Sequence, residues 1–238
     1  MKNSVRRNEA VRRMAVIALF TALAYVVMIV IHVKVAFLTL DVKDAVITLC
    51  GLYFGPLSAL FIAVVVPLLE LAVSSTGFYG LIMNILGSVS FSVTASLIYK
   101  YKKTLVGAIV GLATGATVMV AVMLLANLFI TPYYMGVTAE VVREMIPTLL
   151  LPFNVLKSII NVGVVLLLYK TFSKALKRAG FLHGTRRMSE DGGECAPVLS
   201  QRKKWVSLAV TLSAVLLIAA ASLLIFTVFK GQFQFGTK

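Results

Sequence analysis

Charged and chemically reactive side chains are scarce in this chain of 238 residues. Only 13% of the residues are charged, and two cysteines, Cys50 and Cys195, are too few for a disulfide framework. His32 and His183 are isolated, and the sequence contains no zinc motif, no Ser-His-Asp set and no GxxxxGKS/T phosphate loop. We therefore expect no catalytic residue, no metal site and no bound cofactor, and we expect that the chain does not itself hydrolyse ATP.

Long apolar runs are abundant instead. Apolar residues make up 60% of the chain, and the mean hydropathy is +0.97. The runs recur between short polar clusters, as in a bundle of membrane-spanning helices. The first run, 14–31, is long enough to span a bilayer and no clear small-residue cleavage site follows it, so we expect a retained helix rather than a signal peptide. The composition predicts an all-α integral membrane protein.

Basic residues indicate how the chain is oriented. Most of the 23 lysines and arginines fall in three patches, residues 2–13, 100–103 and 170–204. This clustering follows the positive-inside rule, so the net charge of +14 is a topological signal and does not predict nucleic-acid binding. We expect a multi-pass protein of the plasma membrane with a cytoplasmic N-terminus.

The apolar stretch 45–73 is interrupted at Gly55-Pro56, so it makes either one pass or two. A single pass would place the basic patch 100–103 outside, whereas two passes place it inside, and Gly-Pro is a turn signal. We therefore predict two passes. The first is short, because ten residues of helix reach only ~15 Å against ~30 Å of hydrocarbon. It must lie inside the bundle or line a cavity, unless the stretch is one kinked helix.

These choices divide the chain into five parts. A basic cytoplasmic N-terminus (1–13) precedes a membrane domain (14–170), a polar cytoplasmic linker (171–204), an additional C-terminal span (205–229) and an outer tail (230–238). Within the membrane domain, residues 33–44 and 131–146 are expected to form outer loops. The predicted spans of that domain are 14–32, 45–54, 57–73, 79–99, 105–130 and 147–169.

Three polar residues interrupt the last of these spans. Asn154, Lys157 and Asn161 have the spacing i, i+3 and i+7, which puts them on one helix face near its outer end. The lysine stem can simply snorkel toward the headgroups. Alternatively, the ammonium group is a donor inside a cavity open to the outside, beside amides that donate and accept hydrogen bonds. We favour the second interpretation, which suits a neutral or anionic ligand with a carbonyl-rich edge.

Further polar and aromatic residues gather near the same outer surface. Asn127 precedes the cluster Phe129, Tyr133 and Tyr134, and Asn84 lies in the span 79–99. Taken singly, the amides are typical of interhelical hydrogen bonds and the aromatics of a headgroup belt. Their joint position favours a ligand site that stacks a flat ring.

One acid, Glu70, is embedded in a spanning run. An acid in hydrocarbon is costly unless it has a partner or a task. Two roles are equally open: Glu70 pairs with Lys157 across the bundle, or it orients the loop at residues 74–80.

Small residues form two strips that let helices approach closely. One strip lies in the first span and consists of Ala15, Ala18 and Ala22; the other lies in the fifth and consists of Gly107, Gly111 and Gly115. The partner of each strip is either another helix of this chain or another protein. Internal packing is the simpler expectation, especially for the glycines.

Three segments together resemble a known family. They are VAFLTLDVKDAVITLCGLYFGP at 35–56, STGFYGLIMNILGS at 75–88 and LPFNVLKSIIN at 151–161. Over residues 10–178 the chain resembles the riboflavin-specific substrate-binding (S) components of energy-coupling factor (ECF) vitamin importers. The resemblance implies a six-helix S-component bundle that holds riboflavin near the outer face.

The resemblance also implies which residues touch the vitamin. The polar edge of the isoalloxazine would be bound by Asn127, Asn154 and Lys157. The ring and the ribityl chain would be enclosed by Phe37, Leu38, Gly77 and Tyr79. Asn84 and Glu70 complete the set of substrate-binding residues that we expect.

The family further implies partners. Its alanine strip, matched here by Ala15, Ala18 and Ala22, docks on a transmembrane coupling subunit, which joins two cytoplasmic ATPase subunits. The S component is thought to topple within the bilayer to deliver its cargo. The span 205–229 departs from the family pattern, because members usually end soon after the sixth helix.

The leading hypothesis is therefore a membrane subunit for riboflavin uptake. A close variant is an S component for another vitamin, although a cationic one such as thiamine would be disfavoured by Lys157. A membrane-embedded lipid-modifying enzyme would have only Glu70 as a candidate acid. In a purely structural scaffold, Asn154 and Lys157 would merely bond between helices.

Overall fold

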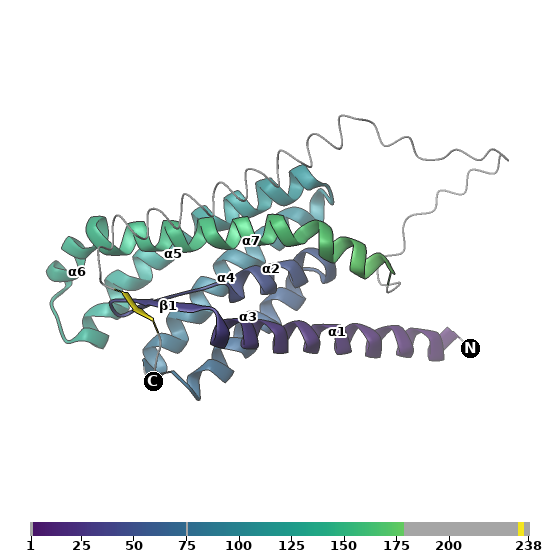
Figure 1. The fold of residues 1–238 in the computed structure, drawn as a ribbon, viewed down its shortest axis with the longest axis horizontal. Helices are drawn as coiled ribbons and strands as arrows, with labels where there is room; N and C mark the ends of the chain where they lie inside the picture. The colour runs from purple at the N-terminus through teal and green to yellow at the C-terminus, as the bar shows by residue number, and fades with distance from the viewer. Residues whose placement is uncertain (1, 75, 179–232, 236–238) are drawn as a thin grey trace.

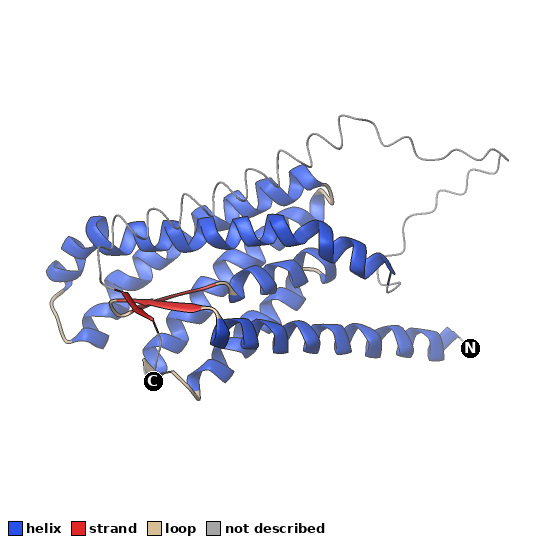
Figure 2. Cartoon of the chain, viewed as in Figure 1, coloured by secondary structure: helices blue, strands red, loops and turns tan. Residues whose placement is uncertain are grey.

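The computed structural model describes residues 2–74, 76–178 and 233–235, and these are predominantly helical (Figures 1 and 2). Four of the described helical segments are long and apolar enough to cross a membrane: Ala10–Val30, Gly77–Tyr101, Leu105–Met135 and Ala139–Leu176. The helices are α1 Lys2–Val30, α2 Lys43–Phe54, α3 Pro56–Leu71, α4 Gly77–Tyr101, α5 Leu105–Met135, α6 Ala139–Met145, a π-helical turn η1 Ile146–Leu150, and α7 Leu151–Arg178. The strands are β1 His32–Val35, β2 Leu38–Asp41 and β3 Phe233–Phe235.

Each predicted span of the membrane domain overlaps one of these helices. The stretch 45–73 forms two helices, as predicted, because α2 ends at Phe54 and α3 begins at Pro56. Gly55 has φ 97°, a conformation that favours glycine, and Pro56 has no N–H, so it can start a helix without losing a hydrogen bond. The predicted span 205–229 and most of the predicted linker lie outside the described residues.

The short helix α2 lies inside the bundle, as predicted. Its residues from Lys43 to Leu52 are all buried, and it packs against α1, α3, α4 and α7. A helix that is apolar around its whole circumference is stable only when other helices cover all of its faces. Because Gly55 leaves the helical conformation between α2 and α3, the alternative of one kinked helix is wrong.

Several helices extend past the limits that hydropathy predicted. The basic segment 1–13 was expected to precede the first span, yet α1 is helical from Lys2. Much of the expected outer loop 131–146 is helical in α5 and α6, and α7 continues from residue 169 to Arg178. Hydropathy marks where a helix leaves hydrocarbon, whereas good helix formers such as Ala, Glu, Lys and Arg continue it into water.

The expected outer loop 33–44 is mostly a β-hairpin. Strands β1 and β2 pair antiparallel with Val35 opposite Leu38, and Ala36 in the turn has φ 53°. Strand β3 pairs with the other edge of β1, so the order in the sheet is β2-β1-β3. Part of the predicted tail 230–238 thus lies beside the hairpin, far from the N-terminus and from the end of α7 (Figure 1).

Helices α4 and α5 approach closely along the glycine strip. A Cβ atom on Gly111 would lie 2.7 Å from the carbonyl oxygen of Ala95, and one on Gly115 would lie 2.7 Å from that of Phe91. The atoms in the way belong to the backbone and yield little. These two glycines therefore serve internal packing.

Replacing Gly115 with alanine should destabilise the protein. Alanine gains up to ~1 kcal/mol of helix propensity, but overpacking against a backbone carbonyl costs about 1–3 kcal/mol, so the net effect is a loss. Thermal unfolding in detergent measures it. Thr114→Ala, on the exposed face of the same helix, is the control and should leave the midpoint unchanged. An equal midpoint for both variants would contradict the packing argument.

Candidate functional site

A cavity opens at the end of the bundle that carries the hairpin. It holds about 800 Å³ of space, counting the part open to solvent, and is walled by the hairpin, α2–α5 and α7. Eight of the predicted substrate-binding residues line it: Phe37, Leu38, Glu70, Tyr79, Asn84, Asn127, Asn154 and Lys157. Gly77 is not in the lining; it begins α4 with φ 58°.

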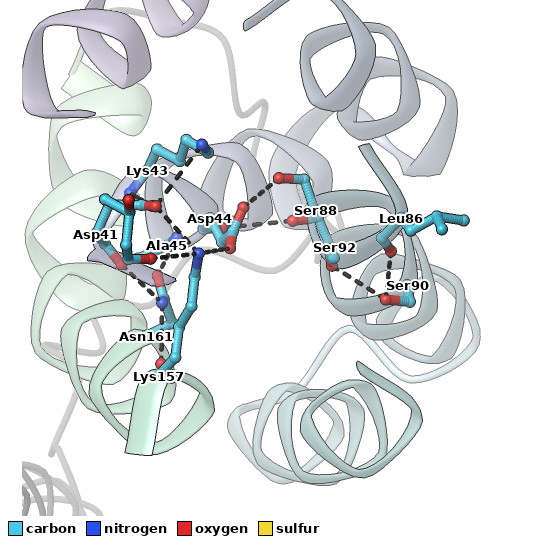
Figure 3. A network of polar contacts seen from close by, with 12 residues as sticks. Asp41, Lys43, Asp44, Ala45, Leu86, Ser88, Ser90, Ser92, Lys157 and Asn161 are labelled. Atoms are coloured by element: carbon cyan, nitrogen blue, oxygen red, sulfur yellow. Dashed lines mark hydrogen bonds and ion pairs between the residues drawn. The ribbon is translucent and has the colours of Figure 1, made fainter. Parts of the chain in front are cut away.

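The Lys157 ammonium group is sheltered within this cavity. Its side chain is only 9% exposed, and its Nζ lies 3.0 Å from Asp41 Oδ2 and 3.4 Å from the carbonyl oxygen of Thr39 (Figure 3). Asp44 Oδ2 is also near, at 3.9 Å. The amine therefore contacts protein acceptors and does not reach toward headgroups, so the snorkelling interpretation is wrong.

Lys157 belongs to a buried charge network of two lysines and three carboxylates. Asp41 Oδ2 lies 3.6 Å from Lys43 Nζ, which in turn lies 2.5 Å from Glu70 Oε2. Burial by itself raises the pKa of Asp41, but the Lys157 and Lys43 ammonium groups outweigh it and hold that pKa below its ordinary value. Asp41 is therefore the negative group that joins the two lysines.

Two expectations about buried acids are corrected by this network. Glu70 forms its ion pair with Lys43, so of its two open roles the pair with Lys157 is wrong, while the orientation of the loop at residues 74–80 stays a prediction. Glu70 is also not alone, because Asp41 and Asp44 are both 1% exposed. The segment that carries them was expected to be an exposed loop, whereas the hairpin and the start of α2 bring it inside the bundle.

Asn161 has a structural position rather than a place in the cavity wall. Its Oδ1 accepts the Ala45 N–H at 2.8 Å, and its Nδ2 donates to the carbonyl oxygen of Asp41 at 3.2 Å. The first N–H groups of a helix have no partner within it, so Asn161 satisfies one at the start of α2. It fixes α2 and the hairpin to α7, and the interpretation that grouped it with the donors beside a ligand is wrong.

Two other amides face the cavity. Asn127 donates from Nδ2 to the Met123 carbonyl at 2.7 Å, and Asn154 donates from Nδ2 to the Leu150 carbonyl at 2.8 Å. Each bond follows the i to i−4 pattern and fixes the side chain against its own helix. An amide nitrogen carries two hydrogens, so each asparagine retains a second N–H for a ligand.

Aromatic rings gather at the mouth. Tyr134 lies between Phe37 and Tyr79, with ring centroids 6.5 Å and 6.3 Å away. Phe129 and Tyr133 are 67% and 78% exposed and do not line the cavity. Of the predicted aromatic cluster, only Tyr134 is therefore placed to contact a ring bound in the cavity.

The remaining lining residues were not foreseen. They are Thr39, Asp44, Ser74, Thr76, Gly80, Met83, Gly87, Ser88, Met119, Met123, Ile130, Thr131 and Phe153. Small hydroxyl and methionine side chains carry little pattern of their own in an apolar helix. Asp44 did have a usable signal, since it directly precedes the predicted span 45–54, which is too short to cross a membrane.

The predicted alanine strip of α1 lies away from the cavity lining. Ala15, Ala18 and Ala22 are exposed on the outer surface of α1.

Within residues 2–178 other than Ser75, no three His, Cys, Asp or Glu side chains form a group suited to a metal ion. The groups available for binding are thus hydrogen-bond donors, carboxylates and aromatic or methionine surfaces.

A bundle of membrane-crossing helices around a cavity with convergent polar groups defines a membrane protein that binds a small molecule. Residues 12–170 match the family model described as "ECF transporter, substrate-specific component". The chain belongs to this family.

Two relatives illustrate the similarity. The chain is 31% identical over 176 residues to the riboflavin transporter RibU of Staphylococcus aureus (strain TCH60), an alignment that covers 70% of this chain and 93% of RibU. It also matches a solved structure described as the S component of a bacterial ECF transporter, with a TM-score of 0.61 and 32% identity over 70% of this chain and 98% of that one.

Proposed function

We propose that the protein binds riboflavin in the cavity at the hairpin end and delivers it inward together with an ATP-driven energy-coupling module. The observation that carries the proposal is the Lys157 ammonium group, held inside a cavity that opens at one end of the bundle. Similarity to a riboflavin transporter supports the choice of vitamin.

The donors suit the polar edge of a flavin. An ammonium group has three N–H donors, and Asp41 and Thr39 accept two of those of Lys157. The third, together with the second N–H groups of Asn127 and Asn154, is available to the carbonyl oxygens and ring nitrogens of an isoalloxazine. The pocket therefore offers several fixed donors to an acceptor-rich edge.

The other walls suit the rest of the vitamin. Phe37, Tyr79 and Tyr134 present aromatic surface at the mouth, where a planar ring is favoured by offset or edge contacts. Methionine side chains in the lining adapt their shape to an apolar surface. Asn84 and Glu70 are polar groups that suit the hydroxyls of the ribityl chain.

Purified protein should carry flavin or take it up on titration. Binding to the folded state alone stabilises it by RT ln(1 + [L]/Kd), which is about 2.7 kcal/mol at a hundredfold excess over Kd. Absorption and fluorescence detect co-purified flavin, and thermal unfolding with added riboflavin measures the stabilisation. Thiamine at the same concentration is the control and should give no shift. Protein that neither contains flavin nor is stabilised by it would refute the proposal.

The proposal includes an orientation and partners. The N-terminus is cytoplasmic, residues 1–13 and 171–204 face the cytoplasm, 205–229 crosses the membrane and 230–238 lies outside. The exposed alanine strip of α1 (Ala15, Ala18 and Ala22) docks on the transmembrane coupling subunit, which joins two cytoplasmic ATPase subunits. Support for this comes from the positive-inside pattern and from the exposure of the strip.

A further inference from the structure

Asp41 lies where the hairpin, α2 and α7 meet. Its Oδ2 contacts Lys157 Nζ at 3.0 Å, its Oδ1 accepts the Lys43 N–H at 3.2 Å, and its carbonyl oxygen accepts from Asn161 Nδ2 at 3.2 Å. The residue is 1% exposed and is not part of the cavity lining. Asp41 therefore reaches the cavity directly through Lys157 and, one step further away, through Lys43 and Glu70.

Strand β2 supplies both near acceptors of the Lys157 ammonium group. The carbonyl oxygen of Thr39 and the carboxylate of Asp41 accept two of its three hydrogens, at 3.4 Å and 3.0 Å. Because the hydrogens of an ammonium group have fixed tetrahedral directions, two bonds determine where the third hydrogen points. The hairpin thus sets the direction of the remaining donor.

A second carboxylate competes for the same ammonium group. Asp44 Oδ2 lies 3.9 Å from Lys157 Nζ, and Ser88 Oγ donates to Asp44 Oδ1 at 2.5 Å. Asp44 lines the cavity, whereas Asp41 does not. If Asp41 lost its charge, Coulomb attraction would draw the ammonium group toward Asp44. The third N–H of Lys157 would then bond to the Asp44 carboxylate and would no longer be available to a ligand.

We propose that Asp41 is a positioning residue for ligand binding: it keeps the Lys157 ammonium group from moving closer to Asp44 and aims the free N–H of Lys157 into the cavity. This inference rests on the proposed binding of riboflavin. It extends that proposal to a residue that does not touch the ligand and that lies 116 positions from Lys157 in the sequence.

The test is a double-mutant cycle on riboflavin affinity. Asp41→Asn should weaken binding roughly tenfold in the wild-type background, the effect of losing one charge-assisted hydrogen bond. In the Lys157→Met background the same change should alter affinity less than about twofold, because Asp41 acts through Lys157. Equal losses in both backgrounds would mean that Asp41 acts through general stability and would overturn the inference.

The variants are expected to fold. In Asp41→Asn, Lys43 keeps Glu70 at 2.5 Å and Lys157 retains Asp44. Asp41→Glu preserves the charge and should recover part of the affinity, whereas recovery no better than that of Asp41→Asn would count against a role for the charge. Tyr99→Phe removes a buried hydrogen bond to Tyr169 outside the cavity and should leave affinity unchanged.

The absorption spectrum of bound flavin gives a readout independent of stability. Hydrogen bonds at the ring edge shift its bands, so Asp41→Asn should move the spectrum toward that of Lys157→Met, and Tyr99→Phe should not. A wild-type protein that binds no flavin would overturn the proposed function and this inference together. Wild-type affinity and spectrum in Asp41→Asn, with weakened binding in Lys157→Met, would overturn the positioning role alone.

Discussion

Replacing Lys157 with methionine should weaken riboflavin binding at least tenfold. Methionine keeps an unbranched side chain of similar reach but removes the ammonium donor that faces the cavity. A hydrogen bond to a charged group contributes about 1.5–3 kcal/mol, and each 1.4 kcal/mol is a factor of ten in affinity. The loss is therefore expected to lie between tenfold and about a hundredfold.

Fluorescence titration of flavin-free protein measures this loss. The fold should persist, because Asp41 keeps Lys43 at 3.6 Å and Asp44 keeps the Ser88 hydroxyl, and thermal unfolding without ligand verifies it. Lys100→Met is the matched control, since Lys100 is exposed at the end of α4. Wild-type affinity in Lys157→Met would remove Lys157 from the site.

Replacing Lys43 with methionine should destabilise the protein even without ligand. Lys43 is fully buried and its Nζ lies 2.5 Å from Glu70 Oε2, so its loss leaves Glu70 without its cation. Breaking a buried ion pair by removing one partner costs 3–5 kcal/mol. Glu70 retains 12% exposure at the cavity, so we expect a loss near the lower limit, about 3 kcal/mol.

A double variant separates the effect of the unpaired charge on stability from the effect of lost packing. Lys43→Met with Glu70→Gln removes both charges and should recover part of the unfolding midpoint, because no unpaired carboxylate remains at that position. Lys102→Met, at an exposed position after α4, is the control for removing a lysine. A midpoint for Lys43→Met equal to that of wild type would show that the buried pair contributes no stability.

The helical part of the fold was predictable because long apolar runs have few alternatives in a membrane. The turn at Gly55-Pro56 and the burial of α2 followed from length and backbone chemistry alone. Asn154 and Lys157 were found for the same reason, since polar groups in an apolar run are conspicuous.

The hairpin and its acids were not predictable in this way. Four-residue strands are too short for a clear alternating pattern, and a segment with Asp41, Lys43 and Asp44 resembles a solvated loop. Their partners Glu70 and Lys157 are 27 and 116 residues away from Lys43 and Asp41, so local sequence gives no sign of the pairing.

The prediction that the aromatic residues near the end of α5 act together was wrong for a geometric reason. Successive residues on a helix point about 100° apart, because a turn contains 3.6 residues. Tyr133 and Tyr134 therefore point in different directions, and Tyr134 lines the cavity while Tyr133 is exposed. Proximity in sequence was not enough to assign both to a ligand.

The β1–β2 hairpin has a kinetic consequence. It carries lining residues Phe37 and Leu38 at its turn and Asp41 at its end. A movement that lifts the whole hairpin from the cavity must also part Asp41 from Lys157, and breaking a buried ion pair costs free energy. A bound molecule that leaves by this route can do so only when the ion pair breaks. This requirement favours a long residence time of the ligand.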